Sequence, residues 1–353
     1  MALIGATVSA LRGQPGPAMI GDWPLADVQG AGLATGLTAL AGRLGLFDDA
    51  SPEVRAFVSE QRAQVASRVD RFRRLTPQVL SALGDAAIPA VAVKGARLID
   101  GVWPWPECRP MSDIDLLVPP RYRAQASAVL ARSGWATHST TTYEDTMLAW
   151  GDGAPGRLDG ESVEHNGRIE VHPGWIEFLH GYTVTGFDVE RHSVVAAQGR
   201  ALTREAVAAH VIGHLASTVV RAEVRAVNAI DVWFLAGFEL DWGAVAGVMS
   251  TVDPRLTAAG LWVVDQLIPD LVPPIVLESE LRRLPRRGRD RLLRTRALDV
   301  MRDPSQRTTV AWRLAFTTTR SERVAVVRQM VRRPGGRTPA AVRAWWTRQA
   351  ARR

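Results

Sequence analysis

Residues 109–118, with the sequence RPMSDIDLLV, are the stretch that decides the fold. Asp113 and Asp115 alternate with apolar residues, which is typical of a strand with one polar face. Because side chains two apart on a strand point to the same side, both carboxylates share a face while Ile114 and Leu116 turn to the core. Such a pair suits Mg²⁺, which takes one or two carboxylates together with substrate phosphates. The alternative is a strand end whose acids reach water or pair with arginine.

Upstream of this block, residues 88–93 form a short apolar run that predicts a buried strand. The run ends at Lys94-Gly95, and residues 96–102 predict a short helix. Glycine at such a junction lets the backbone approach a phosphate, which the first N–H groups of the helix attract. Lys94 is the only lysine among the 43 lysine and arginine residues. A lone lysine in an arginine-rich chain indicates a position that needs a compact point charge.

Downstream, residues 168–172 (RIEVH) predict another strand, on which Glu170 faces away from its two apolar neighbours. Glu170 would supply a third carboxylate, either as a metal ligand or as a base for an attacking hydroxyl. His172 shares its face and would position substrate, move a proton or hydrogen-bond Glu170. The Asn166-Gly167 dipeptide predicts a hairpin that joins residues 162–164 to residues 168–172.

Helical spacing of apolar residues dominates the rest of the chain. Ser51 before Pro52 predicts the start of a helix that runs to about residue 83, after shorter helices near the N-terminus. From residue 187 onward we expect helical structure. The predicted helices of that half are 203–220, 226–235, 241–252 and 258–267, and a further helix is predicted at 121–132.

The sequence therefore predicts an α+β fold, in which a small mixed β-sheet core with helices is joined by N-terminal helices and a C-terminal helical domain. The expected units are an N-terminal helical region (1–84), the core (85–186), a helical domain (187–280) and an arginine-rich helical tail (281–353).

Charge is unevenly distributed along the chain. Residues 281–353 hold 21 arginines and four acids, whereas the net charge of the whole chain is only +7, so the preceding part is net acidic. The basic tail predicts contact with nucleic acid or another anion, or else forms a solvated helical face. Cys108 is the only cysteine, which excludes an internal disulfide and a cysteine-rich zinc site. With no apolar run of about 18 to 20 residues and no signal-like start, we expect no transmembrane segment and a cytoplasmic protein.

The order of three motifs resembles the uncharacterised nucleotidyltransferase family within the DNA polymerase β-like superfamily. These motifs are Lys94-Gly95, the aspartate block at 109–118 and Glu170-Val171-His172. The resemblance extends to residues 210–214 and Asp231 in the helical half. It implies a small mixed sheet with two metal-binding aspartates on one strand and a third acid on a neighbouring strand. It also implies transfer of a nucleoside monophosphate from an NTP, with release of pyrophosphate.

The resemblance assigns roles residue by residue. The implied ligands of Mg²⁺, in a two-metal site that Mn²⁺ would also suit, are Asp113, Asp115 and Glu170. The implied contacts to the triphosphate are Lys94, Gly95, Arg109 and Ser112, although the superfamily usually has Gly-Ser where this chain has Lys94-Gly95. The implied supports around the site are His172, His214 and Asp231.

Several of these residues also have structural interpretations. Arg109 would brace the aspartate loop as readily as bind phosphate, and Asp231 would brace an arginine across the helical domain. His210 and His214, four apart on one helical face, suggest zinc but lack an evident third ligand.

The sequence is compatible with three functions. The first is an enzyme that transfers a nucleoside monophosphate to a hydroxyl on a small molecule, a peptide or a protein. The second uses the same chemistry on an RNA or tRNA end, which the arginine-rich tail favours. The third is a non-catalytic NTP-binding interaction module, against which the three acids and the lone lysine argue. The base of the NTP and the acceptor are not predicted.

Overall fold

The computed structural model describes most of the chain, with gaps. The described residues are 2–14, 20–141, 144–149, 156–157, 163–164, 167–177, 183–185, 187–196, 199–221, 226–294 and 314–331.

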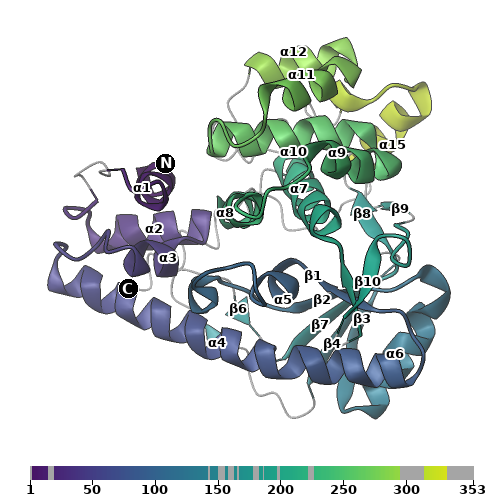
Figure 1. The fold of residues 1–353 in the computed structure, drawn as a ribbon, viewed down its shortest axis with the longest axis horizontal. Coiled ribbons are helices and arrows are strands. Elements are labelled where there is room, and N and C mark those ends of the chain that lie inside the picture. The colour runs from purple at the N-terminus through teal and green to yellow at the C-terminus, as the bar shows by residue number, and fades with distance from the viewer. Residues whose placement is uncertain are drawn as a thin grey trace.

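A five-stranded mixed sheet lies at the centre of the molecule (Figure 1). Its strands, in spatial order, are β1 (Val91–Val93), β2 (Ile114–Leu117), β7 (Arg168–His172), β4 (Asp145–Ala149) and β3 (Trp135–Thr140). β2 and β7 are parallel, and the other neighbouring pairs are antiparallel. β1 and β2 are buried along their whole length. The α+β fold with a small mixed sheet is confirmed, and β1, β2 and β7 lie where the sequence predicted strands.

The predicted hairpin around Asn166-Gly167 is wrong. β7 is the middle strand, and its neighbours are β2 and β4. β6 (Val163–Glu164) pairs instead with β5 (Gly156–Arg157), and Asn166 lies outside the described residues. The local turn signal failed because a central strand needs a partner on both sides, and the buried β7 takes both partners from other parts of the chain.

Helix α4 (Pro52–Asp85) runs along the sheet, below it in Figure 1 and next to α6 (Arg123–Arg132). The side chain of Ser51 accepts a hydrogen bond from the backbone N–H of Val54, so the predicted N-cap is confirmed. Shorter elements connect the strands: α5 (Lys94–Leu98) and the 3₁₀ turns η1 (Pro106–Cys108) and η2 (Pro120–Tyr122).

In Figure 1 the N-terminal helices lie to the left of the sheet, and the C-terminal helices lie above it, on the side opposite α4. The N-terminal group comprises α1 (Ala2–Leu11), α2 (Leu25–Thr35) and α3 (Thr38–Arg43). The C-terminal group comprises α7 (Arg204–Arg221), α8 (Ala226–Ala236), α9 (Trp242–Val252), α10 (Pro254–Leu267), α11 (Pro274–Arg283), α12 (Arg286–Arg294) and α15 (Arg320–Val331). The four helices predicted between residues 203 and 267 are confirmed. Among the described residues, no helix has the length and apolar character to cross a membrane.

The expectation of helical structure from residue 187 onward is wrong for one segment. β10 (Ser193–Ala196) and β11 (Gly199–Leu202) form an antiparallel hairpin before α7. A further two-stranded sheet, β8 (Trp175–Glu177) with β9 (Thr183–Thr185), was also not predicted. Val194 and Val195 are exposed, so the hairpin lacks the alternation of buried and exposed residues from which a strand is predicted.

Candidate active site

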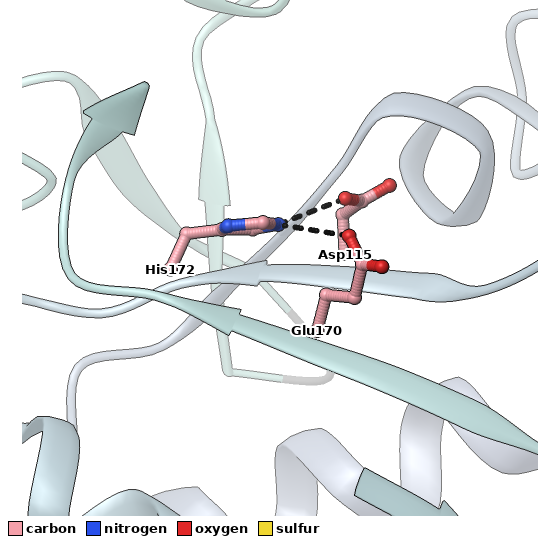
Figure 2. A group of neighbouring side chains, drawn as sticks. All are labelled: Asp115, Glu170 and His172. Carbon is pink, nitrogen blue, oxygen red and sulfur yellow. Dashed lines mark hydrogen bonds and ion pairs between the residues drawn. The ribbon is translucent and has the colours of Figure 1, made fainter. Parts of the chain in front are cut away.

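The parallel pairing of β2 with β7 brings acidic side chains from the two strands together. Asp115 is the register partner of Glu170, so both carboxylates lie on the same face of the sheet. Figure 2 shows the imidazole of His172 directed at both acids. Its Nε2 is 3.0 Å from Oδ1 of Asp115 and 3.6 Å from Oε2 of Glu170. All three side chains are buried, and each offers an atom within 4.8 Å of the others.

Asp113 lies beside this cluster but not on the strand. β2 begins at Ile114, one residue later than the sequence indicated. Asp113 is half-buried and accepts a hydrogen bond of 3.0 Å from the hydroxyl of Ser112. Burial and the charge of Asp115 raise the pKa of Asp113 above its ordinary value, although the positive charges of Lys94 and Arg168 oppose the rise.

Lys94 supplies positive charge directly to the cluster. Its Nζ donates to Oδ1 of Asp115 over 2.6 Å. Burial lowers the pKa of this ammonium, but the carboxylates of Asp115, Glu170 and Asp113 raise it by more. The φ angle of Lys94 is 48°, a left-handed conformation that few residues other than glycine adopt. Such backbone strain is concentrated at functional sites.

Gly95 is required by packing as well as by its place beside Lys94. A Cβ atom added at Gly95 would lie 2.5 Å from Nη1 of Arg109 and 3.1 Å from Cβ of Met111. Only a residue without a side chain fits, so the turn lies directly against the Arg109 guanidinium.

Arg109 is held by the helical half of the chain. Its Nε and Nη2 donate to the two carboxylate oxygens of Asp231 in α8, over 2.8 and 2.7 Å. The indole N–H of Trp103 donates to the same Asp231 over 2.7 Å. The Arg109 and Asp231 side chains are only 5% and 1% exposed. Arg109 is therefore engaged in the bracing role, and phosphate binding by this residue would require the buried pair to break.

Electrostatics distinguish the two acids that face each other across β2 and β7. Burial and the charges of Asp113 and Asp115 raise the pKa of Glu170 to about 7, with Lys94 opposing and Glu144 adding to the rise. A carboxyl with this pKa has the proton affinity of a general base at neutral pH.

Asp115 is shifted the other way. Burial raises the pKa of Asp115, but Lys94 and His172 lower it by more, and the net pKa lies well below the ordinary range. Asp115 is therefore ionised at neutral pH while Glu170 still competes for a proton.

The donor set fits a divalent cation. Carboxylate oxygens and an imidazole nitrogen are ordinary ligands for such ions. Burial and the neighbouring carboxylates raise the pKa values of Glu170 and Asp113, so a bound cation would favour their ionised forms. Within the described part of the chain, Asp115, Glu170 and His172 form the one group of three or more such side chains that could hold a metal ion.

The structure adds three residues to the site that the sequence did not assign. Arg168 forms an ion pair with Glu170. Glu144 lies with Oε2 3.9 Å from Nδ1 of His172. His210 on α7 is buried, and its pKa is lowered to about 3 by burial and then by the positive charge of Lys94.

His210 therefore lies near enough to Lys94, Asp115 and His172 for their charges to act on its pKa. The role predicted for His214, which is half-buried one turn further along α7, stays a prediction. The apolar neighbours of His210 on its helix, such as Val207 and Leu215, could have indicated that this histidine is buried. No signal in the sequence linked it to Lys94.

The small mixed sheet, the acidic side chains on two adjacent strands and the lysine beside them form the arrangement that the motif resemblance predicted. The family model described as uncharacterised nucleotidyltransferase matches residues 32–253. The chain belongs to this family, as the order of its motifs predicted, and is a transferase.

This chain is similar to the solution structure of the antibiotic-resistance factor ANT(2'')-Ia. The match covers 56% of this chain and 94% of the ANT(2'')-Ia chain, with 16% sequence identity and a TM-score of 0.35. No curated protein matches the chain.

Proposed function

We propose that this nucleotidyltransferase is metal-dependent and transfers a nucleoside monophosphate from an NTP to a hydroxyl group on a small molecule, a peptide or a protein. The observation that carries the proposal is the buried cluster of Asp115, Glu170 and His172 with the Lys94 ammonium against it. The left-handed backbone at Lys94 supports the proposal, because such strain is concentrated at functional sites.

Asp115 and Glu170, with Asp113 and His172 beside them, would hold Mg²⁺, or Mn²⁺, in a one- or two-metal arrangement. A divalent cation bound there would neutralise charge on the phosphates of the NTP and stabilise the leaving pyrophosphate. The chain's own side chains position the substrates and move the proton.

Lys94 would bind the triphosphate as a point charge, held in place by Gly95. Ser112 would hold Asp113 in position through its hydroxyl. If Glu170 is not fully engaged as a ligand, its pKa near 7 suits it to accept the proton of the acceptor hydroxyl.

A second acceptor class, an RNA or tRNA end, is favoured by the arginines of α11 and α12. Residues 282–294 contain seven arginines and one acid, Asp290. Phosphate backbones are bound mainly by such positive charge. The sequence beyond α12 contains further arginines.

The two acceptor classes are separated by a labelling experiment. The protein is incubated with each of the four NTPs, labelled at the α-phosphate, and Mg²⁺, with total RNA or with a deproteinised, RNA-free metabolite extract. Label on the metabolites or on the protein itself supports the first acceptor class, and label on RNA supports the second. NTP binding without any label transfer would instead support a non-catalytic module.

A further inference from the structure

Arg168 has a position in the site that its ion pair alone does not explain. It precedes Glu170 by two residues on β7, so the two side chains share a face of the sheet. The guanidinium pairs with the carboxylate of Glu170. The Arg168 side chain is 34% exposed and that of Glu170 is 11% exposed, so Arg168 is the more exposed partner of the pair.

The pair does not brace the fold. Both partners belong to one strand, so their contact joins no two elements of the structure. Partly exposed ion pairs also contribute little to stability. The contrast is the buried pair of Arg109 and Asp231, which ties the loop before β2 to α8.

Arg168 also retains hydrogen-bonding capacity. Its Nε is buried and has no hydrogen-bond partner among the described residues. The carboxylates of Glu170, Asp113 and Glu144 all raise the pKa of its guanidinium, although burial lowers it. Two of these, Asp113 and Glu170, are the carboxylates that the proposed function assigns to a metal ion.

We propose that Arg168 is a phosphate-binding residue of the nucleotide site. It donates to the carboxylate of Glu170, and it would donate to the polyphosphate of the NTP when a divalent cation is bound by that carboxylate. The planar guanidinium fork matches phosphate oxygens, and Lys94 bears the same relation to Asp115. This inference rests on the proposed function.

If Arg168 binds Glu170 or phosphate in this way, its removal should change the affinities for metal and for phosphate in opposite directions. A merely structural role would not produce this result. In R168A the carboxylate of Glu170 loses its competing cation, so Mn²⁺ alone should bind severalfold more tightly. Pyrophosphate, the product common to all four NTPs, should bind the Mn²⁺-loaded protein roughly 10- to 100-fold more weakly, because charge-assisted hydrogen bonds to its oxygens are lost. R168K keeps the charge without the fork and should lie between the two.

Both affinities are measured on the full chain, Mn²⁺ by electron paramagnetic resonance and pyrophosphate by calorimetry. R121A is the matched control, because Arg121 forms an arginine–glutamate pair with Glu190 at the exposed surface. It should leave both affinities unchanged, and thermal unfolding of each variant reports whether it folds.

The outcomes separate this inference from the proposed function. If the wild type binds both probes and R168A matches it, or loses both together while folded, Arg168 is not a phosphate ligand although the site stands. If the wild type binds neither Mn²⁺ nor pyrophosphate, and D115N behaves identically, the proposed function fails and the role of Arg168 with it.

Discussion

Replacing Asp231 with alanine tests whether the helical half of the chain holds the Lys94-Gly95 turn in place. The carboxylate of Asp231 accepts two hydrogen bonds from Arg109 and one from Trp103, at 2.7 to 2.8 Å. Without it, the Arg109 guanidinium stays buried and loses its counter-ion. Breaking a buried pair in this way costs about 3–5 kcal/mol of stability. We therefore expect D231A to lower the free energy of unfolding by about this amount.

The same variant should also impair the site. Because Gly95 lies against Nη1 of Arg109, a shift of the guanidinium moves the turn that carries Lys94. Urea titration gives the free energy of unfolding, and pyrophosphate release, measured below the unfolding transition, gives the activity. The double variant R109M/D231A buries no charge and should recover part of the lost stability. A loss below about 1 kcal/mol in D231A, or unchanged activity in the folded variant, would refute the bracing role.

Three further results are expected. G95A should lose about 1–3 kcal/mol of stability and most activity, because its Cβ would overlap the anchored Arg109. The control G84A in α4, where an added Cβ meets nothing within 4 Å, should be neutral or slightly stabilising. Equal effects of the two substitutions would contradict the packing argument. The affinity for Mn²⁺ should rise as pH increases through about 7, because the metal requires ionised Glu170 and must displace its proton below that pH. E170Q should flatten this pH profile. If the affinity of the wild type does not change between pH 6 and 8, Glu170 is not a ligand. H210A should reduce activity less than H172A, since His172 contacts Asp115 and Glu170 directly, and the reverse order would mean that the wrong histidine has been placed in the cluster.

Local pattern was enough to predict the strands that build the site. Asp115 and Glu170 each sit between buried apolar residues on short strands, and this alternation can be read along the chain. That their strands are parallel neighbours in register could not be read, because strand pairing depends on the whole sheet. β3 carries mostly exposed residues, so its sequence lacks the alternation that would have identified a strand.

Side-chain partners were predicted least well, for a related reason. Arg109 and Asp231 lie 122 residues apart, and sequence reasoning offered bracing only as one of two roles for Arg109. In the sequence, Arg168 resembles an arginine at a solvated strand end, and only the structure shows its ion pair with Glu170. A residue's chemistry is visible in the sequence, whereas its neighbours are set by tertiary packing.

The most direct test of the central claim compares pyrophosphate release by the wild type and D115N. With Mg²⁺ and its preferred NTP, the wild type should release pyrophosphate in proportion to the nucleotide transferred. D115N should release pyrophosphate at least about 100-fold more slowly while it remains as stably folded as the wild type. The reason is that Asp115 is the ionised carboxylate at the centre of the cluster. Release by D115N at the wild-type rate, or none by the wild type with any of the four NTPs and either Mg²⁺ or Mn²⁺, would contradict the account.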